Sequence, residues 1–490
     1  MSDTKKTPDL VLIVSLGLGV ILFSLNEADT DFFGHLTYGG EILESGSMPT
    51  VNKYSYTYPD YPWVNHKWLT SAIFASLNSL FGSGGILILK IAIFLMIIGV
   101  LNSTIKKIYP GIHPLARFLT LVISSGFLQA ASHPRAHIFT YLFTSILLWI
   151  LYSDYNVKKM IFLLSAIFIP WVNLHGGVIA GYGIFYLWVI TKLFQKDGDQ
   201  PLTRPHLIII SLCLPIFLLI NPYGLDLPAQ LWTELATDKS MIAEWQPLPL
   251  FTWNYLIFKI LFAVVIPLSF LWRKEIKPFP TLLATITFLM SIRYFRHIPF
   301  FGISSALILP ILFDNYLSRY AKSLNNVTGK FLNSFALFSR LKRIMIIAPC
   351  LLIVFLPHVI GYPSSMTIYP PPDFYPIEHV RWLKGNNIKG NLLNSFNWGK
   401  YLTYELYPDI KICIDGRLDT AYPEKFLTEY FDFYFGENAS SDFLRKYDHE
   451  LIMLEPESPQ VEKLLSNDNW NVALRTDEAI LYVKAQGKNE

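Results

Sequence analysis

The chain has 490 residues, of which 52% are hydrophobic and only 16% are charged, whereas about 25% of the residues of a soluble protein are charged. The net charge of +3 is too small to predict a nucleic-acid partner. The three cysteines imply no disulfide framework. Apolar stretches of roughly 16 to 20 residues recur, which is typical of an α-helical polytopic membrane protein.

The apolar stretches predict about eleven membrane spans. The first follows Lys5 and Lys6; a cleaved signal peptide is the alternative, but the apolar run is long for one and "LNEADTD" offers a poor cleavage site. The expected spans lie near residues 10–26, 85–105, 113–130, 136–152, 159–174, 177–194, 206–220, 253–272, 279–292, 296–313 and 344–361.

Loop charge predicts the orientation. If the N-terminus is cytoplasmic, every cytoplasmic loop carries Lys or Arg, as the positive-inside rule requires. This holds only if the short amphipathic segment 67–82 lies in the interface and does not cross the membrane. The transmembrane domain then covers 1–361, with a first outer loop at 27–84.

The tail, residues 362–490, is expected on the outer side of the membrane. It begins with the Pro-rich "YPPPDFYP", which is typical of a stiff linker. Strand-like runs such as "GNLLNSF" and "IKICIDG" then alternate with helix-like runs such as "EKFLTEYFDFYF". This alternation predicts a small α/β domain.

The unusual polar residues gather on the predicted outer side. Ionisable groups that cluster on one side of a membrane protein indicate a site. Cations on this side are disfavoured by the positive-inside rule, and a phosphate explains them because Arg binds it through a rigid fork of donors. The predicted phosphate-binding residues are Arg135, Arg293, Arg296 and His297, and the predicted substrate-binding residues are His35, His66, Lys67, His175, Glu244, Asp415 and Arg417.

Asp29 and Asp31 form an Asp-x-Asp directly after the first span. A cap for the helix expected in "FFGHLTYGGEILESG" is one explanation for one of them. The other explanation is that an acid of the pair acts as a general base on an acceptor hydroxyl while the cations hold a leaving phosphate. A divalent cation bound by the pair is an alternative, to which His35 and His66 could add ligands, although no tight ligand spacing is present.

The order of several short blocks resembles the GT-C glycosyltransferases, in the bacterial branch related to protein O-mannosyltransferases and lipid A aminoarabinose transferases. The loop "DTDFFGHLTYGGEILESGSMPTVNKYSYT" carries the likeness, and "HKWLTSAIFASLNSLFG" stands where those enzymes keep an interfacial helix. The blocks "SHPRAHIFT", "NPYG", "AEWQP", "RYFRHIPFF", "NWGKYL" and "IDGRLDT" follow in order.

The resemblance implies transfer of a sugar from a polyprenyl-phosphate donor to a glycan, lipid or protein acceptor, on the outer face of a bacterial plasma membrane. It assigns the first-loop acid to Asp31 or Asp29. Two other classes stay open: a transporter or flippase, and a non-catalytic assembly factor for lipid-linked glycans. Repeated halves, typical of transporters, are absent from the sequence.

Overall fold

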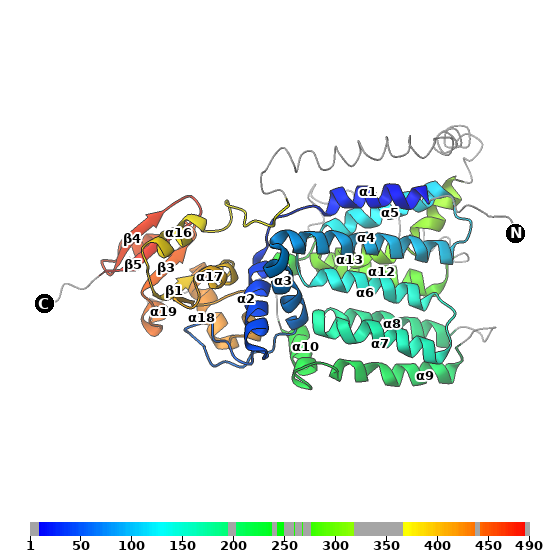
Figure 1. Ribbon diagram of the computed structural model, residues 1–490, viewed down its shortest axis with the longest axis horizontal. Coiled ribbons are helices and arrows are strands. Elements are labelled where there is room, and N and C mark those ends of the chain that lie inside the picture. The colour runs from blue at the N-terminus through cyan, green and yellow to red at the C-terminus, as the bar shows by residue number, and fades with distance from the viewer. Residues whose placement is uncertain are drawn as a thin grey trace.

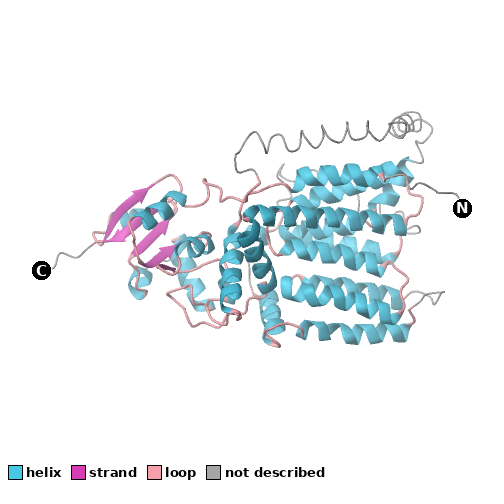
Figure 2. Ribbon diagram, in the orientation of Figure 1, coloured by secondary structure: helices cyan, strands magenta, loops and turns pink. Residues whose placement is uncertain are grey.

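The computed structural model describes residues 9–194, 202–237, 243–248, 259, 267, 276–317, 366–436 and 442–485. A bundle of roughly parallel helices forms one part of the molecule and a small domain with a sheet forms the other (Figures 1 and 2). Helices α2, α3 and α10 lie across the end of the bundle that faces the small domain. The site described below lies at this junction.

The bundle is held together by one large apolar core. Nine of the ranges expected to span the membrane fall on its helices, and most of 253–272 and all of 344–361 lie outside the described residues. The bundle helices are α1 (Leu10–Phe23), α4 (Ser83–Ile108), α5 (Pro114–Gln129), α6 (His137–Leu151), α7 (Val157–Leu174), α8 (Val178–Leu193), α9 (Arg204–Cys213) with η1 (Leu214–Leu219), α12 (Pro278–Arg293) and α13 (Ile298–Ser305).

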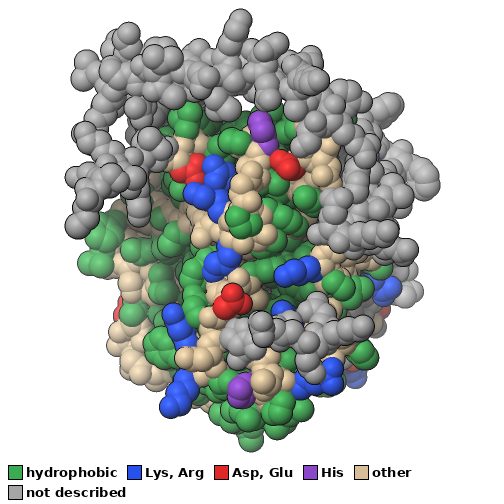
Figure 3. All heavy atoms as spheres, turned by 90° about the vertical axis from the view of Figure 1, so that its right-hand side faces the viewer, with side chains coloured by type: hydrophobic (Ala, Val, Ile, Leu, Met, Phe, Trp, Pro, Cys, Tyr) green, Lys and Arg blue, Asp and Glu red, His purple; other side chains and the backbone are tan. Residues whose placement is uncertain are grey.

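Length and composition show which helices can cross a membrane. In the described part of the chain, α4 and α7 are long and apolar enough to cross, and the bent pair Phe295–Ser305 and Leu309–Leu317 can count as a third span. The remaining apolar helices of the bundle are shorter. The end of the bundle away from the small domain carries Lys and Arg side chains (Figure 3), among them Lys106, Lys107, Lys158, Lys159, Lys192, Arg204 and Lys277.

Helices α2 (Thr30–Ser45) and α3 (Trp68–Phe81) form a closely packed pair across the end of the bundle. Asp29 begins α2 by accepting hydrogen bonds from two backbone N–H groups of its first turn. Gly46, at φ 63°, ends α2 in the left-handed conformation that glycine adopts without strain. A Cβ at Gly39 would lie 1.9 Å from the backbone oxygen of Ser71, so only glycine allows the two helices this close.

The small domain is built on a five-stranded sheet in the order β2-β1-β3-β5-β4. The strands β1 (Gly390–Asn394), β2 (Ile410–Ile412) and β3 (Leu451–Leu454) are parallel, whereas β5 (Ile480–Lys484) runs antiparallel to β3 and to β4 (Trp470–Arg475). The helices of this domain are α16 (Ile377–Gly385), α17 (Gly399–Leu406), α18 (Glu424–Phe435), α19 (Asp442–Lys446) and α20 (Val461–Leu465).

The loop between α2 and α3 joins the bundle to the small domain. Ser55 forms a parallel bridge with Ile412 of β2, and its hydroxyl donates to the carbonyl of Cys413 at 2.9 Å. The Asn52 side chain donates to the carbonyl of Ala421 at 2.9 Å. Residues of this loop therefore extend the hydrogen bonding at the β2 edge of the sheet. These bonds hold the small domain against the loop that follows α2.

Candidate active site

A cavity of about 1090 Å³ lies where the end of the bundle, α2 and the small domain meet. Its lining is polar at this junction and becomes apolar between α8 and α12. The polar part includes Asp31, His35, His66, Lys67, Arg135, His137, Thr140, His175, Glu234, Glu244, Arg296, His297, Lys400 and Arg417. The apolar part includes Ile179, Ala180, Gly183, Ile184, Leu187, Ile190, Leu283, Ile286 and Met290.

Asp31, in the first turn of α2, meets two lysines from different parts of the chain. One carboxylate oxygen pairs with Lys400 of α17, and the other lies 3.4 Å from Nζ of Lys67. Lys400 reaches Asp31 across Gly34, where a Cβ would lie 2.9 Å from Cδ of the lysine. Burial alone would raise the pKa of Asp31, but the two lysines hold the pKa well below its usual range.

Asp29 has a different environment, although it is only two residues away. One carboxylate oxygen caps α2, accepting from the N–H groups of Asp31 and Phe32 at 3.1 Å each. The other oxygen pairs with the Arg135 guanidinium. Asp29 is thus engaged on both oxygens and is absent from the cavity lining, so its contacts are those of a helix cap and an ion-pair partner.

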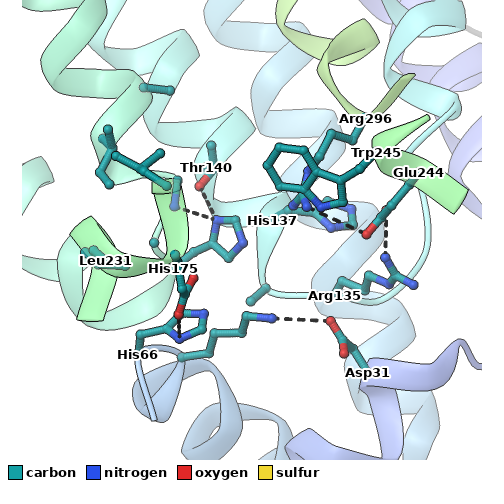
Figure 4. A pocket seen from close by; sticks show the side chains of 18 of the residues that line it. Asp31, His66, Arg135, His137, Thr140, His175, Leu231, Glu244, Trp245 and Arg296 are labelled. Atoms are coloured by element: carbon teal, nitrogen blue, oxygen red, sulfur yellow. Dashed lines mark hydrogen bonds and ion pairs between the residues drawn. The ribbon is translucent and has the colours of Figure 1, made fainter. Parts of the chain in front are cut away.

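Glu244 lies between two arginines at one end of the cavity (Figure 4). Its carboxylate accepts from Nη1 of Arg135 at 2.9 Å and lies 3.8 Å from Nη1 of Arg296. The Arg296 guanidinium lies 4.3 Å from the centre of the Trp245 ring, a cation–π contact. Burial would raise the pKa of Glu244, but Arg135 and Arg296 lower it, so the carboxylate is ionised.

His66 and His175 lie toward the other end of the cavity (Figure 4). Nδ1 of His66 lies 3.0 Å from a carboxylate oxygen of Glu234 in α10 (Asp226–Ala236). Nδ1 of His175 accepts from the backbone N–H of Gly177 at 3.1 Å and lies 2.8 Å from Oγ1 of Thr140. Since a backbone N–H can only donate, neutral His175 carries its proton on Nε2.

His35 is a buried core histidine. Its Nδ1 lies 2.9 Å from the Ser71 hydroxyl, which itself donates to the carbonyl of Lys67 at 3.2 Å. Burial lowers the pKa of His35 to about 3, so it is neutral at physiological pH. His35 therefore acts mainly in the contact between α2 and α3.

Asp415 and Arg417 form a buried pair at the edge of the small domain. Nε of Arg417 donates to both carboxylate oxygens, at 3.0 and 2.9 Å, and the Tyr38 hydroxyl of α2 donates to Asp415 at 3.0 Å. The guanidinium also lies 4.5 Å from the centre of the Trp63 ring. These contacts link the small domain to α2 and to the loop that follows it.

The cavity unites most of the residues that the sequence singled out. Asp31, His35, His66, Lys67, Arg135, His175, Glu244, Arg296, His297 and Arg417 line it, whereas Asp29, Arg293 and Asp415 do not. Arg293 is exposed, and its Nε donates to the Tyr294 hydroxyl at 2.9 Å. Two lining residues were not predicted as site residues: Glu234, which lies in the same predicted outer loop as Glu244, and Lys400 of the block "NWGKYL", which no local signal connects with Asp31.

The donor set does not fit a divalent cation. Asp29 pairs with Arg135, and Asp31 pairs with Lys400 and Lys67. In the described part of the chain, no three His, Cys, Asp or Glu residues are placed to share a metal ion. Because both carboxylates already pair with cationic side chains, the positive charge of a metal ion would be repelled there.

Comparison with known proteins gives matches at the level of structure. No protein-family model matches the sequence, and a sequence search of curated proteins gives no match. The oligosaccharyltransferase AglB from Archaeoglobus fulgidus, in complex with an inhibitory peptide and a dolichol-phosphate, matches with a TM-score of 0.59 at 11% identity, over 93% of this chain and 70% of its own.

A second solved structure covers almost the full length of both chains. ArnT from Cupriavidus metallidurans, bound to undecaprenyl phosphate, matches with a TM-score of 0.54 at 11% identity, over 96% of this chain and 97% of its own. The chain therefore shares the GT-C-like fold of these two structures.

Proposed function

We propose that this chain is a membrane glycosyltransferase that moves a sugar from a polyprenyl-phosphate donor to an acceptor on the outer face of the membrane. The observation that carries the proposal is one cavity that holds Asp31 together with cations from four separate segments. These are Lys67 of the first loop, Arg135 and Arg296 of two bundle loops, and Lys400 of the small domain. The fold agrees with this chemistry, and the matched ArnT and AglB structures hold polyprenyl-type phosphates.

The apolar part of the cavity suits the lipid of such a donor. It continues from the polar part between α8 and α12, along residues about one turn apart such as Ala180, Gly183 and Leu187. A lipid chain along this path leaves its phosphate beside the cations and its sugar beside Asp31. The donor can thus remain in the bilayer while its head group reaches the aqueous side.

The reaction assigned to the site needs one base and a stabilised leaving group. The acceptor hydroxyl gives its proton to the Asp31 carboxylate as its oxygen forms a bond to C1 of the sugar. The bond between C1 and the phosphate oxygen breaks, and the lipid phosphate leaves with the electron pair and one additional negative charge. Lys67, Lys400, Arg135 and Arg296 are placed to stabilise that charge.

We propose about eleven spans in a bacterial plasma membrane, with a cytoplasmic N-terminus and residues 362–490 outside. The basic end of the bundle would face the cytoplasm, and the cavity and small domain would face outward. Glycans, lipids and proteins are all candidate acceptors at this face. No step of the proposed reaction uses a metal, because both carboxylates of the Asp-x-Asp pair with cations.

The proposal is tested with the purified full chain in lipid nanodiscs and a panel of undecaprenyl-phosphate sugars. We expect one donor to lose its sugar to an acceptor from the host envelope. D31N should lower the rate by at least about a hundredfold, as for loss of a general base. D60N is the matched control, because Asp60 is an exposed residue of the same loop. Unchanged surface glycans in cells that express stable D31N protein would refute the role of Asp31.

A further inference from the structure

The small domain places a buried lysine in the cavity of the membrane bundle. Lys400 lies in the first turn of α17 and is only 6% exposed. Its Nζ pairs with Asp31 and lies 3.4 Å from the position of a Cβ at Gly416. Gly34 on one side and Gly416 on the other therefore leave room for the lysine to reach the carboxylate. A larger residue at Gly34 would occupy the path of this lysine, whose Cδ lies 2.9 Å from the Cβ position.

The approach of α17 depends on close packing. A Cβ at Gly399 would lie 2.3 Å from the backbone oxygen of Ile414, so the first turn of α17 lies directly against the segment that follows β2. The Asp415–Arg417 pair follows β2 and links this edge to Tyr38 of α2. Lys400 is thus held beside Asp31 by the same contacts that fix the small domain on α2.

The cations of the cavity are already balanced by internal carboxylates. Lys400 and Lys67 share Asp31, and Arg135 and Arg296 share Glu244. An arriving phosphate must therefore compete with a carboxylate for its cations. Of these two carboxylates, only Asp31 is proposed to act as the base. Competition for its lysines therefore changes how strong a base Asp31 is.

We propose that Lys400 is a phosphate-binding residue supplied by the small domain, and that the donor phosphate frees Asp31 for catalysis by taking Lys400 and Lys67 from it. This inference rests on the proposed function. A carboxylate held by two ammonium groups is a weak base, and it becomes a stronger one when a phosphate shares those groups. Donor binding and activation of the base are then the same event. Without a bound donor, the Asp31 carboxylate stays paired with Lys400 and Lys67.

The charge change of the reaction fits this exchange. The donor phosphodiester carries one negative charge, and the departing lipid phosphate carries two. Asp31 loses its negative charge when it accepts the proton of the acceptor hydroxyl. The total charge of the site is therefore unchanged, while the demand for Lys400 and Lys67 moves from Asp31 to the phosphate. Interactions that strengthen as the bond breaks accelerate the step.

The test measures binding of undecaprenyl phosphate, with uncharged undecaprenol as the reference lipid, to the full chain in nanodiscs at neutral pH. K400M should weaken binding by at least about tenfold, as expected for loss of a charge-assisted hydrogen bond. D31N should tighten binding by several-fold, because the phosphate no longer competes with a carboxylate, while it lowers the transfer rate by at least about a hundredfold. K389M is the matched control, since Lys389 forms an exposed pair with Asp409 in the same domain.

The outcomes separate the inference from the function on which it rests. If the unmodified chain binds undecaprenyl phosphate no better than undecaprenol, the proposed function fails. If it prefers the phosphate and K400M binds as well as K389M does, only the inference fails. If K400M does not fold, D31N still tests the inference. Weaker or unchanged binding of undecaprenyl phosphate by D31N would show that Asp31 and the phosphate do not compete for the lysines.

Discussion

Nδ1 of His66 lies 3.0 Å from a carboxylate oxygen of Glu234, so the ring of a first-loop histidine is oriented by a residue of α10. A carboxylate beside Nδ1 favours the tautomer with its proton on that nitrogen. Nε2 is then the hydrogen-bond acceptor of neutral His66, in a side chain that lines the cavity. This arrangement suits a contact with the acceptor hydroxyl.

Asparagine and glutamine variants separate the two nitrogens of His66. The amide nitrogen of H66N can replace Nδ1 and keep the bond to Glu234, but nothing replaces Nε2. We expect H66N to keep the melting temperature of the unmodified chain and to lose about tenfold in transfer rate, as for one lost hydrogen bond to a substrate. Full transfer by H66N would show that His66 serves only to contact Glu234. H66Q is the converse variant, because its side chain reaches the position of Nε2 but not that of Nδ1.

Two arginines three residues apart give a second prediction. Arg296 lines the cavity and stacks on Trp245, whereas Arg293 is exposed. We expect R296Q to weaken undecaprenyl phosphate binding by about tenfold, because a charged hydrogen-bond donor is lost. R293Q is the matched control and should bind as the unmodified chain does. Equal losses in both variants would contradict the placement of the phosphate beside Arg296.

This contrast shows what the sequence could predict at the site. The positive-inside pattern indicated that "RYFRH" lies on the outer side, and loop charge grouped its arginines with Arg135. It could not distinguish Arg293 from Arg296, because the last turn of α12 and the following 3₁₀ turn point them differently. The resemblance named both Asp29 and Asp31, and only the cap geometry shows that Asp29 is engaged on both oxygens.

The fold was predictable where the pattern was strong. The apolar runs predicted the described bundle helices, and the strand-like runs "GNLLNSF" and "IKICIDG" fall on β1 and β2. Strand β4 was missed, although Trp470, Val472 and Leu474 alternate along it; it is an edge strand in which no residue is fully buried. The contact of Lys400 with Asp31 was also missed, because 369 residues separate the two and no local signal joins them.

The apolar part of the cavity gives a third prediction. A Cβ at Gly183 would meet no atom within 4 Å, so a larger side chain there can be accommodated by the fold and can fill the lipid path. We expect G183L to slow transfer from undecaprenyl-phosphate donors more than from donors with a short prenyl chain. G99L is the matched control, because Gly99 of α4 also has open space around it and does not line the cavity. Equal effects on long and short donors would place the lipid elsewhere.

His449 gives a pH-dependent prediction for the small domain. It is buried, its ring stacks on Trp470, and burial lowers its pKa to about 4. The unfolded chain binds the proton near pH 6.5, so between pH 6.5 and 4 the unfolded state binds more protons and stability falls as the pH falls. The slope is at most about 1.4 kcal/mol per pH unit for one group. Thermal unfolding from pH 7 to 5 should show a shallower decline in H449F, and an unchanged decline would contradict this role.

The buried pair between Asp415 and Arg417 predicts how the small domain can be released. D415N would leave the Arg417 guanidinium buried without its counter-charge, which costs about 3–5 kcal/mol. D409N is the matched control, because exposed ion pairs contribute little. We expect D415N to lower the melting temperature and to expose the linker before α16 to protease, whereas D409N does neither.

The same variant connects stability to chemistry. Because Lys400 reaches Asp31 only while α17 is docked, D415N should also weaken undecaprenyl phosphate binding, although Asp415 itself does not line the cavity. Replacing both partners, as in D415N with R417M, removes the unpaired buried charge and should recover part of the stability. Recovery of stability together with phosphate binding would show that docking, and not the Asp415 carboxylate, is what the site requires. A D415N protein with normal melting and an intact linker would show that the pair does not hold the small domain in place.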